Sequence, residues 1–160
     1  EMKMGNQIVS QRVYDGKTAL NSSMGIKSDI VGQELVELKE QAAFCKEAGY
    51  ISLGHKLALK SIEDLNGKPA YVVELTYPEG KKLTEYYEVK TALKLREMFS
   101  TTLEDGQVVT QITEFADYRP EGGVLMPHTI TVSGMFPFPV TAVLSEVKVN
   151  AGVDDAVFKL

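Results

Sequence analysis

The histidines are the first residues to consider for chemistry, because a neutral imidazole can bind a metal ion or carry a proton. The 160-residue sequence contains two of them, His55 and His128. Neither lies in an HExxH or HxxEH pattern, which would place two imidazoles and a carboxylate on one helical face. No zinc site is therefore predicted, and a surface or turn-supporting role is the simpler interpretation of both histidines.

Cysteine and serine are the candidate nucleophiles. The single cysteine, Cys45, has Lys46 beside it, and a neighbouring cation is one of the features that activate a thiolate. Cys45 also falls on the apolar stripe of a predicted helix, which favours a buried small apolar residue instead. No serine lies in a GxSxG elbow, which is the strand-turn-helix setting of many serine nucleophiles.

Paired carboxylates and glycine-rich turns complete the search for catalytic groups. Asp154-Asp155 and Glu104-Asp105 lie in predicted turns, where helix capping and solvation explain them. Gly122-Gly123 precedes a strand, and no GxxxxGK phosphate loop occurs. Because no group of residues supplies nucleophile, base and stabiliser together, we predict a protein that is not an enzyme and has no metal or cofactor.

The composition is that of one globular domain with no membrane-spanning segment. Hydrophobic residues make up 44% and charged residues 24% of the chain, and the formal net charge is −5. Only Arg12, Arg96 and Arg119 are arginines, so no clustered basic face is available to bind nucleic acid. The longest apolar stretches are shorter than the roughly 18 residues that a membrane-spanning helix needs.

Segments of period-two alternation, separated by turns about ten residues apart, predict an antiparallel meander of about eight strands. The clearest hairpin signal is Asn66-Gly67, a dipeptide that accepts positive φ at both central positions of a type I′ turn. We expect the last long strand over Val140–Val149. The predicted class is mainly β (α+β): a curved antiparallel sheet with one helix on its concave side.

That helix is predicted over Gly32–Lys46. Leu35, Leu38, Ala42 and Cys45 recur at helical spacing, and Gly49 supplies a stop. We expect the apolar stripe of this helix to cover the apolar face of the sheet, because this packing removes the most apolar surface of both elements from water.

Met135, Phe136 and Phe138 lie in a segment punctuated by Pro137 and Pro139, which must form a loop, bulge or edge. Apolar loops of this kind often mark a partner or lipid contact. The alternative is that the loop folds back to cap an open end of the core.

Several segments resemble the LolA/LolB-like superfamily of outer-membrane lipoprotein-sorting proteins. The resemblance is carried by Asn66–Glu74, Gly80–Lys82, Thr84–Tyr87, Leu93–Glu97, Asp117-Tyr118, Gly123–Ile130 and Val147–Asn150, with Asp155 and Phe158. It covers residues 50–158 well and the first third of the chain loosely. Within this superfamily, the sequence looks most like the C-terminal domain of some insulinase-type zinc peptidase homologues of Gram-negative bacteria.

The resemblance implies a half-barrel sheet whose concave apolar side is covered by helices and accepts the acyl chain of a lipoprotein. It also implies a location in the periplasm or cell envelope. We therefore expect residues 1–160 to form a single domain of a longer envelope protein that binds a lipid or lipoprotein acyl chain. The alternative is an interaction domain of a larger, peptidase-like protein with no ligand of its own.

The candidate ligand-binding residues are apolar side chains that the alternation could gather on one side of the sheet, together with two leucines of the helix. The set is Leu35, Leu38, Val73, Leu75, Leu95, Phe99, Ile112, Ile130 and Val132. The candidate contact loop is the segment that contains Met135, Phe136 and Phe138.

Overall fold

The computed structural model describes residues 2–4, 7–43, 45–103, 105–135 and 137–158 of the chain. The chain divides into two compact units, one formed by residues 1–49 and 151–160 and the other by Tyr50–Asn150. Phe136, a predicted contact residue, and Glu104, a predicted turn residue, lie outside the described residues. Each unit is a separate piece of β structure.

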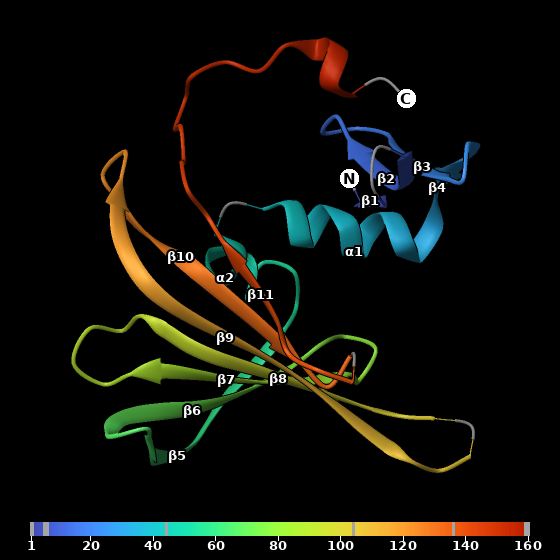
Figure 1. Ribbon diagram of the computed structural model, residues 1–160. Helices are drawn as coiled ribbons and strands as arrows, with labels where there is room; N and C mark the ends of the chain where they lie inside the picture. The colour runs from blue at the N-terminus through green and yellow to red at the C-terminus, as the bar shows by residue number, and fades with distance from the viewer. Residues whose placement is uncertain (1, 5–6, 44, 104, 136, 159–160) are drawn as a thin grey trace. The chain divides into compact units, whose positions relative to one another are not determined.

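The first unit contains a four-stranded antiparallel sheet and the main helix (Figure 1). Its elements are β1 (Met2–Met4), β2 (Gln7–Tyr14), β3 (Ala19–Ser23), β4 (Ile26–Ile30), α1 (Gly32–Ala42), α2 (Lys46–Gly49) and the 3-10 turn η1 (Asp155–Phe158). Between β2 and β3 the carboxylate of Asp15 accepts hydrogen bonds from the backbone N–H groups of Lys17 and Thr18. These bonds lower the pKa of Asp15 and hold the tight turn that the Asp15-Gly16 pair predicts.

Helix α1 ends earlier than its apolar spacing suggests. Ala43 has extended backbone angles, φ −66° and ψ 126°, so the helix stops at Ala42 and does not continue to Lys46. Cys45 therefore lies outside α1 and is exposed, and its predicted burial on the helix stripe is wrong.

The second unit is an open, curved sheet of seven antiparallel strands, each paired with its neighbour in sequence (Figure 1). Its strands are β5 (Lys56–Leu65), β6 (Lys68–Thr76), β7 (Lys82–Glu88), β8 (Lys94–Thr102), β9 (Val108–Glu121), β10 (Val124–Ser133) and β11 (Val140–Val143). Asn66 and Gly67 both have positive φ, +56° and +81°, as the predicted type I′ hairpin requires.

The predicted class is confirmed: the protein is mainly β, with an open curved antiparallel sheet and one main helix. In the described part of the chain eleven strands form two sheets, where the alternation suggested about eight strands in one sheet. The last strand ends at Val143 and not at Val149, because β11 pairs with only four residues of β10. The predicted packing of α1 on the seven-stranded sheet stays a prediction.

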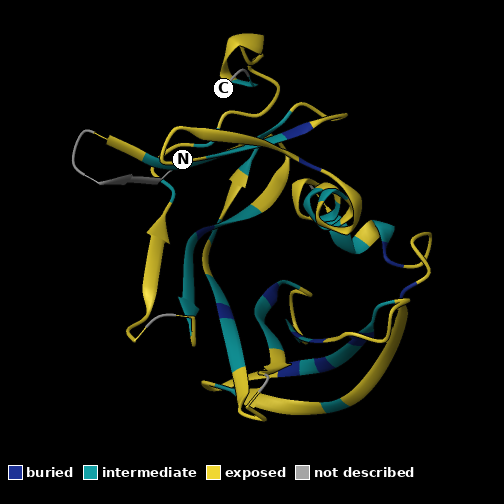
Figure 2. Ribbon diagram, turned by 90° about the vertical axis from the view of Figure 1, so that its right-hand side faces the viewer, coloured by how far each residue is buried: buried dark blue, intermediate teal, exposed yellow. Residues whose placement is uncertain are grey.

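Burial within the seven-stranded sheet is concentrated in β6 and β7, where Ala70 and Val72 are buried on one face and Leu75, Leu83 and Glu85 on the other. In Figure 2 many of the turns are yellow, and dark blue occurs both within strands and in the segment before β5, where Tyr50 and His55 are buried. The core cluster consists of Tyr50, Leu75 and Leu83, with Tyr77 and Phe99 packed against it. This cluster comes from three neighbouring strands, β6 to β8, and from the chain segments that flank β5 and β6.

Candidate functional site

Cross-strand pairing assigns each side chain of the seven-stranded sheet to one of two faces, because directly opposed residues point to the same side. Leu75 pairs with Leu83, Leu83 with Phe99, and Phe99 with Gln111. We call the face that carries these four residues the inner face. It also bears Leu57, Leu59, Ile62, Tyr71, Val73, Glu85, Tyr87, Glu97, Thr113, Phe115, Ile130 and Val132.

The opposite, outer face carries ion pairs between neighbouring strands, and it also bears the buried apolar residues Ala70 and Val72 of β6. Glu74 lies 3.8 Å from the ammonium group of Lys60 and 3.2 Å from that of Lys82. Arg96 and Glu114 form a third such contact, at 2.6 Å. The ion pairs therefore lie on the outer face, whereas the core cluster around Leu75 and Leu83 lies on the inner face.

Most of the predicted ligand residues of the sheet lie together on the inner face. Val73 and Leu75 of β6, Phe99 of β8, and Ile130 and Val132 of β10 share it. Their contact with a ligand stays a prediction.

Two predicted residues of the sheet do not join this group. Ile112 pairs with Met98 and Ser133 and points to the outer face, because its neighbour Gln111 is the residue that opposes Phe99. The prediction that Ile112 lies on the ligand-binding side of the sheet is therefore wrong. Leu95 lies at an irregularity where Tyr86 pairs with Arg96 but Tyr87 pairs with Lys94, and it has no directly opposed residue in β7.

The two helix candidates, Leu35 and Leu38, are half-buried residues of α1 in the first unit. Their role as a cover for the sheet stays a prediction.

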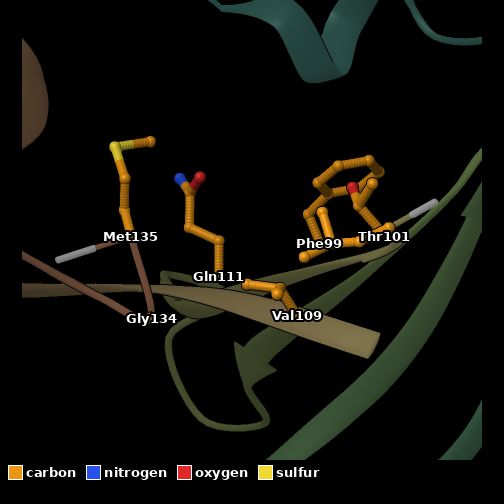
Figure 3. A pocket seen from close by; sticks show the side chains of 7 residues that line it. Phe99, Thr101, Val109, Gln111, Gly134 and Met135 are labelled. Carbon is orange, nitrogen blue, oxygen red and sulfur yellow. The ribbon is translucent and has the colours of Figure 1, made fainter. Parts of the chain in front are cut away.

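An open hollow of about 260 Å³ lies on the inner face, between β8, β9 and the segment after β10. Figure 3 shows Phe99, Gln111 and Met135 projecting from the sheet around it. Its lining residues are Phe99, Thr101, Leu103, Val109, Gln111, Gly134 and Met135. The hollow brings together one residue of the predicted groove, Phe99, and one of the predicted contact loop, Met135.

The loop after β10 keeps its apolar side chains largely in solvent. The exposed fraction is 58% for Met135 and 66% for Phe138. Met135 lines the hollow while Phe138 does not. The two interpretations of this loop, partner contact and cap of the core, both stay predictions.

A buried charge cluster lies beside the apolar part of the inner face. Glu85 is fully buried and accepts hydrogen bonds from the hydroxyl groups of Tyr50 and Tyr87, both at 2.8 Å. The ammonium group of Lys94, itself 9% exposed, lies 2.5 Å from Glu85 and 3.6 Å from Glu97. Because each buried charge here has an opposite charge within contact distance, the cluster avoids the penalty of an unpaired buried ion.

The two histidines are buried, so the predicted surface position is wrong for both. His55 packs edge-on between the rings of Tyr50 and Tyr77, with ring centres 5.6 and 4.6 Å away. His128 is 2% exposed; its Nδ1 lies 2.9 Å from the carbonyl oxygen of Leu144 and its Nε2 3.0 Å from Glu121. Both hold chain segments against the sheet.

Asp117 and Arg119 form an exposed pair near His128. Hydrogen bonding from the Arg119 guanidinium lowers the pKa of the Asp117 carboxyl, and the positive charge of Arg119 acts in the same direction. Over the described parts of the chain, no three histidine, cysteine or acidic side chains lie close enough together to hold a metal ion. Nor does any described helix have the length and apolar character needed to span a membrane.

Sequence reasoning missed the polar residues of the inner face. Glu85 and Lys94 are nine residues apart on neighbouring strands, and only the register between β7 and β8 brings them together. The sequence does show that Glu85 alternates with Leu83 and Tyr87, so that the three side chains share one face of β7. The residues between them are mostly polar as well. A charged residue on the face of a strand that otherwise carries apolar residues is the signal that could have identified Glu85.

Solved structures with the same arrangement come from bacteria. A DUF1329 family protein from Desulfovibrio piger superimposes with a TM-score of 0.61 at 17% sequence identity, over 89% of this chain and 62% of its own length. A LolA superfamily protein from Nitrosomonas europaea superimposes with a TM-score of 0.55 at 15% identity, over 89% of this chain and 70% of that chain. The chain has a LolA-like fold.

A third structure, from Vibrio parahaemolyticus, is described as an outer membrane lipoprotein-sorting protein domain. It superimposes with a TM-score of 0.58 at 15% identity, over 89% of this chain and 63% of that chain. The chain thus spans less than two thirds of the length of two of these proteins. No protein-family model matches the sequence, and no curated protein matches it.

Proposed function

We propose that this chain is a non-enzymatic domain of the bacterial cell envelope that binds a lipid or lipoprotein acyl chain on the inner face of its seven-stranded sheet. The observation that carries the proposal is the open hollow between Phe99 and Met135, which continues the apolar core around Leu75 and Leu83. The LolA-like fold supports it, since one structure with this fold is described as a lipoprotein-sorting domain.

The size of the hollow limits what it can hold. Its volume, about 260 Å³, is just below the roughly 300–1,000 Å³ of typical small-molecule pockets. It therefore suits one segment of an acyl chain, with the rest of the ligand lying along the inner face or in solvent. Thr101 and Gln111 are the polar side chains of its lining, and in this proposal they hydrogen-bond the polar end of the ligand.

Chain length of the ligand is the first test. Burial of a methylene group contributes at most about 0.8 kcal/mol, and an open hollow gives only part of this. Lengthening a fatty-acid probe from about ten to about fourteen carbons should thus tighten binding about tenfold or more. Titration calorimetry or displacement of a fluorescent fatty acid measures this trend.

A charge in the hollow should weaken that binding without unfolding the protein. We expect Met135→Glu to lower affinity for the longer probe about tenfold or more, because the carboxylate would stand where the chain loses water. The matched control is Phe138→Glu, which places the same charge in the same loop but outside the hollow. If both variants bind alike, or if no probe of any length binds saturably, the proposal fails and the interaction-domain alternative is preferred.

A further inference from the structure

Strand β5 forms one edge of the seven-stranded sheet and is hydrogen-bonded to a neighbouring strand, β6, on one side only. It is ten residues long, whereas β11 at the other edge has four. Three of its inner-face side chains are apolar and open to solvent: Leu57 is 45%, Leu59 64% and Ile62 59% exposed. A long edge with exposed apolar residues is a template for pairing with another strand.

An irregularity in the middle of β5 gives this edge a self-complementary pattern. The pairing with β6 shifts between Leu59 and Ser61, so that Leu57 and Ile62 share the inner face although they are five residues apart. For the same reason Lys56 and Glu63, seven residues apart, share the outer face. In a regular strand an odd spacing would put each of these pairs on opposite faces.

We propose that β5 pairs antiparallel with β5 of a second copy of this chain, forming a symmetric dimer. In the register that places Leu57 opposite Ile62 of the partner subunit, Lys56 lies opposite Glu63 of the partner subunit. The two-fold axis repeats both contacts, which gives two apolar pairs and two opposite-charge pairs on matching faces. Among the described residues, neither Lys56 nor Glu63 is engaged in an ion pair within its own chain.

Other registers do not combine these features. Moving the partner strand by two residues places Leu57 opposite the acidic Asp64 of the partner subunit and removes both charge pairs. Lys60, a residue type that often blocks edge pairing, is turned to the outer face, where its ammonium group lies 3.8 Å from Glu74. The two-fold axis is perpendicular to the sheet, so the inner faces of both copies lie on the same side of the joined sheet.

Charge reversal tests the register. The wild-type chain should sediment as a dimer, and Lys56→Glu or Glu63→Lys should each weaken dimerisation about tenfold or more, because two attractions become two repulsions. An equimolar mixture of the two variants should dimerise again. In the mixed dimer the two substituted side chains face each other with opposite charges, and so do the two unchanged ones. Analytical ultracentrifugation over a concentration series measures all three.

The matched controls are Lys90→Glu and Glu79→Lys, which make the same charge changes in exposed turns outside β5. They should dimerise like the wild type, and circular dichroism should show all variants folded. A wild-type chain that stays monomeric at the highest attainable concentration overturns the proposal. So does a dimer that both reversals leave unchanged, or a mixture that fails to recover. None of these results depends on ligand binding.

Discussion

Replacing Glu85 with leucine is expected to lower the free energy of unfolding by about 3–5 kcal/mol, the usual effect of removing one partner from a buried ion pair. Glu85 is fully buried and accepts hydrogen bonds from Tyr50, Tyr87 and Lys94. The substitution removes the nearest counter-charge of Lys94, which is 9% exposed, while Glu97 lies farther away, at 3.6 Å. Urea unfolding followed by circular dichroism gives the change.

The double variant Glu85→Leu/Lys94→Met separates the two causes of this loss. Because it removes both buried charges, it should recover a large part of the stability that Glu85→Leu loses. Glu74→Leu is the matched control: Glu74 also contacts two cations, but on the outer face with both lysines more than half exposed, so we expect a loss of about 1 kcal/mol or less. Equal losses for Glu85→Leu and Glu74→Leu would contradict the buried-cluster explanation.

The strands of the second unit could be predicted from sequence because their signals are local. Asn66-Gly67 fixes a hairpin, and the alternation through Val73 and Leu75 assigns both residues to the apolar face, where the pairing places them. A two-residue turn and a period of two need no information from distant parts of the chain.

The facing of Ile112 could not be obtained in the same way. The stretch Val108-Val109-Thr110-Gln111-Ile112 has apolar residues at both parities, so alternation alone permits either facing. Only the pairing of Phe99 with Gln111 decides it, and that register depends on contacts between β8 and β9. The same dependence hid the contact between Glu85 and Lys94.

The end of α1 shows a different limit. The spacing of apolar residues continues past Ala42 to Cys45, yet the backbone turns to an extended conformation at Ala43. Helical periodicity reports which residues share a face if the helix continues, and it does not report where the backbone leaves the helix. Cys45 is exposed for this reason, although its spacing predicts burial.

Replacing Gly134 with alanine is expected to lower the free energy of unfolding by about 2–5 kcal/mol. Gly134 follows β10 with φ +84°, and a Cβ atom there would lie 2.0 Å from the carbonyl oxygen of Thr110 in β9. A backbone oxygen within a paired strand cannot move aside as the end of a flexible side chain does. The variant therefore has both the left-handed backbone strain and a steric conflict between β9 and the chain after β10.

Gly106→Ala isolates the first of these two contributions. Gly106 has nearly the same backbone angle, φ +83°, but no atom lies within 4 Å of an added Cβ. Its loss should stay at about 1–2 kcal/mol, so the excess for Gly134→Ala measures the close approach to Thr110. Because Gly134 also lines the hollow, Gly134→Ala should weaken binding of the fatty-acid probe, whereas Gly106→Ala should not. Similar unfolding free energies for the two variants would mean that β9 and the chain after β10 are not held this close in solution.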